Sequence, residues 1–181
     1  RVVLRIRRAD TDIDQEVTLT KFPDAPPANL PAVSIIETEL IEREIAGANT
    51  RYWALAPKAH DADSPLGVVL WFPSRGAPSR EMLLDRWRPL VATRNLAFIA
   101  VELGTDGSPE TYLKDISAAI ADFRTVHSVD ADRVVAHGHG AGATLAETFT
   151  RQNRSMVHAL LLVGGGELNI SEADPSTRLA Y

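Results

Sequence analysis

The feature that most constrains the fold is the alternation of short apolar runs with segments of helical periodicity in residues 66–163. The apolar runs have strand length and no polar alternation, which is typical of strands buried on both faces of a sheet. The intervening segments start with capping serines or a glycine-rich turn. Strand–helix alternation at this spacing predicts an α/β fold, a mostly parallel sheet with helices on both faces. The expected strands are Gly67–Phe72, Asn95–Val101, Arg133–Ala136 and Val157–Val163, and the expected helices start near Ser79, Ser108 and Gly140.

The N-terminal part of the chain has a different organisation. Residues 1–22 alternate apolar and polar side chains in two stretches, which predicts a short β-hairpin with its turn at Ala9–Asp14. The first stretch starts in mid-pattern at Arg1, so we expect the natural protein to extend upstream. Residues 23–38 include four prolines and are predicted to form an extended linker. We therefore expect three parts: the hairpin 1–22, the linker 23–38 and an α/β domain over 39–181.

The start of the α/β domain is ambiguous. Val33, Ile36, Leu40 and Ile41 fit one face of a helix. Leu40–Ala46 and Arg51–Ala56, separated by a glycine- and asparagine-containing turn, fit an antiparallel hairpin equally well. We favour the hairpin.

Candidate chemistry concentrates in the glycine-rich turn Gly138-His139-Gly140-Ala141-Gly142, between a predicted strand and a predicted helix. A nucleophile elbow has the form G-x-S-x-G in this position, with a strained central serine projecting above the sheet. Here glycine stands where the serine is expected. Glycine has no oxygen, so no acyl-enzyme can form at position 140. Glycine also adopts a positive φ at lower cost than serine does, by about 1 kcal/mol or more.

This turn and its surroundings resemble the α/β-hydrolase superfamily, in its esterase or prolyl-oligopeptidase-like branch. The resemblance rests on the elbow frame, on the strand entry Asp130-x-Asp132-Arg133-Val134, and on His139 at the first variable position. It covers roughly Glu39–Leu168 and includes the order of hairpin, strand and helix. It implies an α/β-hydrolase-like domain that is incomplete at its C-terminal end and has a degenerate elbow.

The resemblance also implies where the remaining machinery belongs. In this superfamily the acid and the histidine follow the nucleophile in chain order, and His158 lies inside the last predicted strand. The oxyanion loop after the first buried strand here reads Pro73-Ser74-Arg75-Gly76. Gly76 could position a backbone N–H and Ser74 supplies a hydroxyl, although the sequence assigns no base to Ser74. We expect no catalytic residue at the elbow itself.

An alternative use of the same turn is dinucleotide binding, which requires G-x-G-x-x-G or G-x-G-x-x-A. Gly138, Gly140 and Ala143 satisfy the second form, and Glu167 follows the next strand as the acidic residue. Against this interpretation, two strand–helix units precede the turn, whereas the fingerprint normally lies on the first strand of its domain. Our main interpretation therefore includes no cofactor.

The N-terminal hairpin resembles the last two strands of a PDZ domain, on the pattern R-x-x-(turn)-x-V-T-L over about twenty residues. Proteins that join PDZ modules to a hydrolase-like domain resemble exported bacterial proteins, some with a trypsin-like protease domain upstream. That resemblance implies an exported or periplasmic location and an upstream PDZ or protease domain in the same polypeptide. The function expected for 39–181 is a non-catalytic ligand-binding or accessory module, with an active esterase or peptidase using another nucleophile as the alternative.

Composition narrows the classes of partner. The net charge of −5 supplies no basic stripe for nucleic acid. No apolar run is long enough to span a bilayer. The chain has no cysteine, which removes disulfides, thiol nucleophiles and thiolate metal sites. His137 and His139 could form a metal pair, but no third ligand is evident, so we expect no metal. The hydrolase-like resemblance, in turn, implies a small-molecule or peptide ligand.

Overall fold

The computed structural model describes residues 2–8, 11–17, 36–45, 50–59, 63–74, 76–102 and 108–164. The chain divides into two compact units, Arg1–Val33 and Ser34–Tyr181. The boundary between the units falls within the predicted linker 23–38, of which residues 23–35 lie outside the described residues. The division into 1–22, 23–38 and 39–181 stays a prediction, with one correction: Thr38 already starts a strand.

The first unit is an antiparallel pair of strands, β1 (Val2–Arg8) and β2 (Thr11–Val17), which confirms the predicted hairpin. The predicted turn at Ala9–Asp14 is too long, because Thr11 to Asp14 belong to β2 and Arg8 faces Thr11 in the register. Polar residues can form a strand ladder as well as apolar ones, because the ladder is made by backbone groups. Hydrophobic alternation alone therefore underestimates strand length here.

The second unit is built on a six-stranded sheet with the order β3-β4-β6-β5-β7-β8. β3 and β4 form an antiparallel hairpin, β4 pairs antiparallel with β6, and the four strands β6, β5, β7 and β8 are parallel. The predicted hairpin is thus confirmed, and the helical alternative for this segment is wrong. The strands are β3 (Thr38–Glu44), β4 (Arg51–Pro57), β5 (Leu66–Phe72), β6 (Leu96–Val101), β7 (Val129–His139) and β8 (Ala159–Val163).

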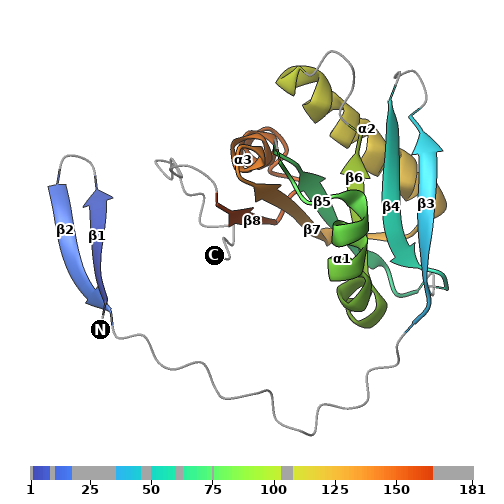
Figure 1. Cartoon of the computed structure of the whole chain (residues 1–181), viewed down its shortest axis with the longest axis horizontal. Helices are drawn as coiled ribbons and strands as arrows, with labels where there is room; N and C mark the ends of the chain where they lie inside the picture. The colour runs from blue at the N-terminus through green and yellow to red at the C-terminus, as the bar shows by residue number, and fades with distance from the viewer. Residues whose placement is uncertain are drawn as a thin grey trace, which may run out of the picture. The chain divides into compact units, whose positions relative to one another are not determined.

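Helices cover both faces of this sheet, as the alternation of strands and helices predicts (Figure 1). α1 (Arg80–Arg94) packs against β4 and β6 on one face. α2 (Pro109–Val126) packs against β6 on the other face, and α3 (Gly142–Gln152) packs there against β7 and β8. None of the described helices is long and apolar enough to cross a membrane.

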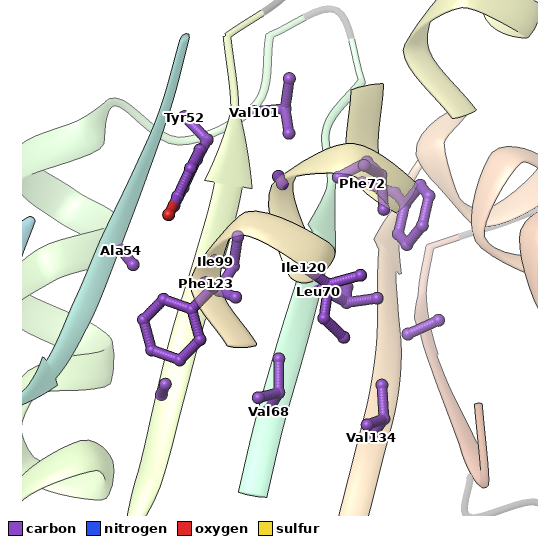
Figure 2. Packing of buried hydrophobic residues seen from close by; sticks show 14 of the residues in the cluster. Tyr52, Ala54, Val68, Leu70, Phe72, Ile99, Val101, Ile120, Phe123 and Val134 are labelled. Carbon is purple, nitrogen blue, oxygen red and sulfur yellow. The ribbon is translucent and has the colours of Figure 1, made fainter. Parts of the chain in front are cut away.

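Side chains on the two faces of β5 belong to two separate hydrophobic clusters. Val68, Leu70 and Phe72 pack under α2 and α3, together with Ile120 and Phe123 (Figure 2). Val69 and Trp71 point to the opposite face and pack with residues of α1. Every residue of β5 is buried, which explains its continuous apolar sequence.

The helices begin where the sequence signals a start. The Ser79 hydroxyl accepts a hydrogen bond from Met82 N at 3.4 Å at the start of α1. The Ser108 hydroxyl does the same for Thr111 N at 3.3 Å, with Pro109 in the first turn of α2. These caps satisfy backbone donors that have no acceptor within the helix. α3 differs: it begins at Gly142, two residues later than expected, and its N-cap residue Ala141 makes no side-chain cap hydrogen bond.

The β3–β4 hairpin is fastened to α2 through Asp122. Arg43 Nε donates to Asp122 Oδ2 at 2.6 Å, and the Tyr52 hydroxyl donates to the same oxygen at 2.7 Å. Tyr52 is 1% exposed, so its hydroxyl depends on this acceptor. The hydrogen bond from Arg43 is the largest cause that holds the pKa of Asp122 below its usual range, and the bond from Tyr52 acts in the same direction.

We expect Asp122→Ala to lower the free energy of unfolding by about 1–3 kcal/mol, because it leaves the buried Tyr52 hydroxyl without its acceptor. A lowered carboxyl pKa stabilises the fold above the unfolded-state value of about 3.9, and this contribution is lost as pH falls through the folded-state pKa. The difference between the two proteins should therefore shrink below about pH 4. Urea unfolding across this pH range measures it. Asp85→Ala, at an exposed position of α1, is the control and should change little.

Candidate functional site

The glycine-rich turn joins β7 to α3 at the carboxyl end of the sheet. Gly140 has φ = 55°, in the left-handed region that the central residue of an elbow requires. Its N–H donates to Val163 O of β8 at 2.8 Å, and its carbonyl accepts from Ala143 N at 3.0 Å. Gly140 is therefore hydrogen-bonded to strand β8 through its N–H and to the start of α3 through its carbonyl.

The outer glycines of the turn allow very close backbone contacts. A Cβ atom on Gly142 would lie 2.0 Å from Phe72 O and 2.6 Å from Pro73 O, where β5 ends. A Cβ on Gly138 would lie 2.5 Å from Ala143 Cα. Neither position has room for a side chain, because strand β7, helix α3 and the end of β5 meet there. This is the packing for which the outer glycines of a G-x-S-x-G turn are needed.

The loop after β5 faces this turn. Phe72 pairs with Gly138 in the parallel register of β5 and β7, so the residues that follow the two strand ends lie side by side. Ala77 N donates to Ser74 O at 3.0 Å, and Gly76 has φ = 73°, as at the third position of a type II turn. Arg75 lies outside the described residues. Ser74 and Gly76, both predicted for this loop, are thus brought to the edge that carries Gly140.

Ser74 occupies the space directly above Gly140. A Cβ on Gly140 would lie 2.9 Å from Ser74 Oγ and 3.2 Å from Ser74 Cβ. Ser74 Oγ lies 3.4 Å from His139 Nδ1, and both side chains are half-buried. The sequence assigned no base to Ser74, and the structure supplies an imidazole at the long end of hydrogen-bond distance. In the sequence, Ser74 and His139 each lie shortly after the end of a predicted strand. This indicates a pair only once β5 and β7 are known to be neighbours.

The neighbouring His137 has a different role from His139. Its Nδ1 donates to Leu161 O at 3.1 Å, because a carbonyl can only accept, and this bond links β7 to β8. Burial lowers the pKa of His137 below its usual value, which favours the neutral imidazole. Its ring makes an edge contact with Trp71, at 4.8 Å between centroids. His137 is therefore a structural residue of the sheet.

Within the described residues, no group of three or more histidine, aspartate and glutamate side chains could hold a metal ion. In this part of the chain, His137 and His139 are therefore not joined by a third side chain of these types. All three tryptophans of the chain are buried: Trp53, Trp71 and Trp87 pack around Phe98. None of the three is available as an exposed ligand platform.

Solved structures with the same arrangement of strands and helices include esterases and an oligopeptidase. A bacterial heroin esterase matches with a TM-score of 0.56 and 20% identity, over 75% of this chain and 47% of its own. An esterase from Rhizomucor miehei matches with a TM-score of 0.57 and 17% identity, again over 75% of this chain and 47% of its own. Oligopeptidase B from Leishmania major matches with a TM-score of 0.52 and 14% identity, over 69% of this chain and 20% of its own. The chain has the α/β-hydrolase fold.

The α/β-hydrolase fold is present here in part, since the chain spans about half the length of the esterases that it matches. No protein-family profile and no curated protein sequence matches the chain. The dinucleotide-binding alternative gains no support: its turn follows β7, after an antiparallel hairpin and two strand–helix units, and Glu167 lies outside the described residues. The PDZ resemblance of residues 1–22 stays a prediction.

We expect Gly142→Ala to destabilise the α/β-hydrolase unit by more than about 3 kcal/mol, because the new methyl group would overlap backbone oxygens that cannot rotate away. The matched control is Gly164→Ala. Gly164 also follows a strand and has φ = 61°, but a Cβ there would meet nothing within 4 Å. The free energy of unfolding of the control should fall only by the cost of a left-handed alanine, about 1–2 kcal/mol. Chemical denaturation of both variants gives the comparison, and equal losses would contradict the close crossing.

A double-mutant cycle tests the packing of Ser74 over Gly140. Gly140→Ala should be destabilising through both backbone strain and contact with the Ser74 side chain. In the Ser74→Gly background the contact is absent and only the strain remains. We expect the two changes to be coupled by at least about 0.5 kcal/mol in unfolding free energy. Additive losses would mean that Ser74 does not occupy the space above the turn.

Proposed function

We propose that residues 39–181 form an α/β-hydrolase-like ligand-binding module whose elbow position is non-catalytic. The observation that carries the proposal is the combination of elbow geometry and glycine at one residue. Gly140 keeps the positive φ of an elbow, and its neighbours Gly138 and Gly142 keep the close crossing, yet position 140 offers no hydroxyl. A module that binds without reacting needs the geometry of the turn and can do without the oxygen.

Hydrogen-bond donors at the turn support a ligand with an acceptor oxygen. α3 begins at Gly142 without a capping side chain. Ala143 N already donates to Gly140 O, but the other N–H groups of a first helical turn have no acceptor within the helix. Such groups favour a carbonyl or carboxylate oxygen at the helix start. The Ser74 hydroxyl faces the same point from the opposite loop. In open α/β sheets, ligands bind outside the carboxyl ends of the strands, which is where these groups lie.

The ligand class follows from these donors. A small molecule or peptide that presents an ester, amide or carboxylate oxygen fits them better than a cation or a nucleic acid does. The esterases and the oligopeptidase with the same fold have names that refer to ester and peptide substrates. On the PDZ resemblance of the N-terminal hairpin, we propose that the module is an accessory part of a larger exported protein, which could include a protease domain.

Binding without turnover can be tested on the full 181-residue chain. The probe is p-nitrobutyranilide, an amide that presents one carbonyl, and the control ligand is p-nitrotoluene, which lacks the carbonyl. In amide NMR spectra of isotope-labelled protein, we expect the anilide at millimolar concentration to shift resonances of residues 138–142 and 74–77. Parallel incubation with p-nitrophenyl butyrate should show no steady hydrolysis above the buffer rate.

Two outcomes would contradict the proposal. If neither ligand or both ligands shift the turn equally, the donors do not recognise a carbonyl. Steady hydrolysis of the ester by the chain would make the module an enzyme. In that case the reactive hydroxyl must come from a residue other than position 140.

A further inference from the structure

The hydroxyl missing from the turn has a counterpart in the facing loop. Ser74 Oγ lies 2.9 Å from the point where a Cβ on Gly140 would be, so it occupies the region that an elbow side chain would enter. The residue is held there from two sides. β5 ends two residues earlier in register with β7, and the turn from Ser74 to Ala77 fixes the loop through a 3.0 Å hydrogen bond.

The second component is an imidazole at the right position to accept a proton. His139 Nδ1 lies 3.4 Å from Ser74 Oγ, across 65 residues of sequence. Hydrogen bonds between a nucleophile and its base are often long in the absence of a substrate and shorten in the complex. His137 is committed to Leu161 O, whereas His139 has Ser74 as its hydrogen-bond partner. The two histidines of the turn therefore divide into a structural residue and a candidate base.

We propose that Ser74 is a nucleophile relocated from the turn to the facing loop, with His139 as its base, and that it accepts an acyl group from an activated ester. Ser74 Oγ attacks the carbonyl carbon while its proton passes to His139 Nδ1. The carbon–oxygen bond to the leaving group then breaks, and the imidazolium returns the proton to the departing alkoxide. The products are acyl-Ser74 and an alcohol, so atoms and charges balance without a further reactant.

The reaction is expected to occur once per chain. Within the described residues, no carboxylate hydrogen-bonds to His139 to orient it, and serine hydrolases that lose this third group lose a factor of about 10⁴ in turnover. The proposed function concerns reversible binding, so capture of an acyl group at Ser74 goes beyond it. A single capture per chain is compatible with a module that does not catalyse repeated ester hydrolysis.

Covalent labelling tests the nucleophile directly. The full chain is incubated with a fluorophosphonate probe, from which the serine oxygen displaces fluoride, and the modified peptide is mapped by mass spectrometry. We expect one modification, at Ser74. Ser74→Ala should abolish it, and His139→Gln should slow it by about 10²–10⁴-fold. The control Ser155→Ala removes an exposed hydroxyl after α3 and should leave the rate unchanged.

A second variant keeps the test decisive if Ser74→Ala perturbs the loop. The chain has no cysteine, so Ser74→Cys introduces a single thiol next to His139. We expect this thiol to react with iodoacetamide near neutral pH faster than the thiol of Ser155→Cys, although Ser155 is more exposed. Addition of His139→Gln should remove the advantage.

The outcomes separate this inference from the proposed function. Absence of modification at Ser74, or labelling that is unaffected by His139→Gln, overturns the relocated nucleophile. Labelling at Ser74 with no steady ester hydrolysis supports both proposals. Steady hydrolysis that disappears in Ser74→Ala supports the nucleophile and overturns the non-catalytic function. Failure of p-nitrobutyranilide to shift the turn contradicts the binding proposal alone.

Discussion

The arrangement of the candidate site depends on one backbone contact, the meeting of the start of α3 with the end of β5. A side chain on Gly142 would collide with Phe72 O at 2.0 Å, so the helix can approach the strand only because glycine stands there. This approach fixes the direction of α3, and with it the position of the turn at Gly140 beneath the loop that starts at Pro73. If the helix stood farther from the strand, Ser74 and His139 would not share a hydrogen bond.

The centre of the sheet was largely predictable, since the parallel strands β5 and β6 are buried on both faces. Burial on both faces requires a continuous apolar run, and β5 and β6 have such runs with boundaries close to those expected. β7 was predicted too short because its first half, from Val129, carries aspartates and an arginine and lies half-buried or exposed. β2 was also predicted too short, because polar residues in its first half, Thr11–Asp14, do not stand out as a strand in the sequence. Hydrophobic patterning reports burial of side chains, while strand pairing is made by the backbone.

The separate segments of the site were predictable from the sequence, but the contact between Ser74 and His139 was not. The glycine pattern indicated the turn, and the loop after β5 indicated Ser74 and Gly76. The pairing of Ser74 with His139 could not be read from either segment, because it depends on which strands are neighbours. Once β5 and β7 are adjacent, the register of Phe72 with Gly138 implies that residues two positions further on, Ser74 and Gly140, face each other.

That relation explains why glycine at position 140 and serine at position 74 occur together. A side chain at position 140 and the Ser74 side chain would compete for one space, with a Cβ-to-Oγ separation of 2.9 Å. A hydroxyl can therefore be presented from the turn or from the facing loop, but the two cannot be added independently. Because position 140 has no side chain, the Ser74 side chain can occupy this space from the other side. The absence of a side chain at position 140 is then a steric condition for the Ser74–His139 contact.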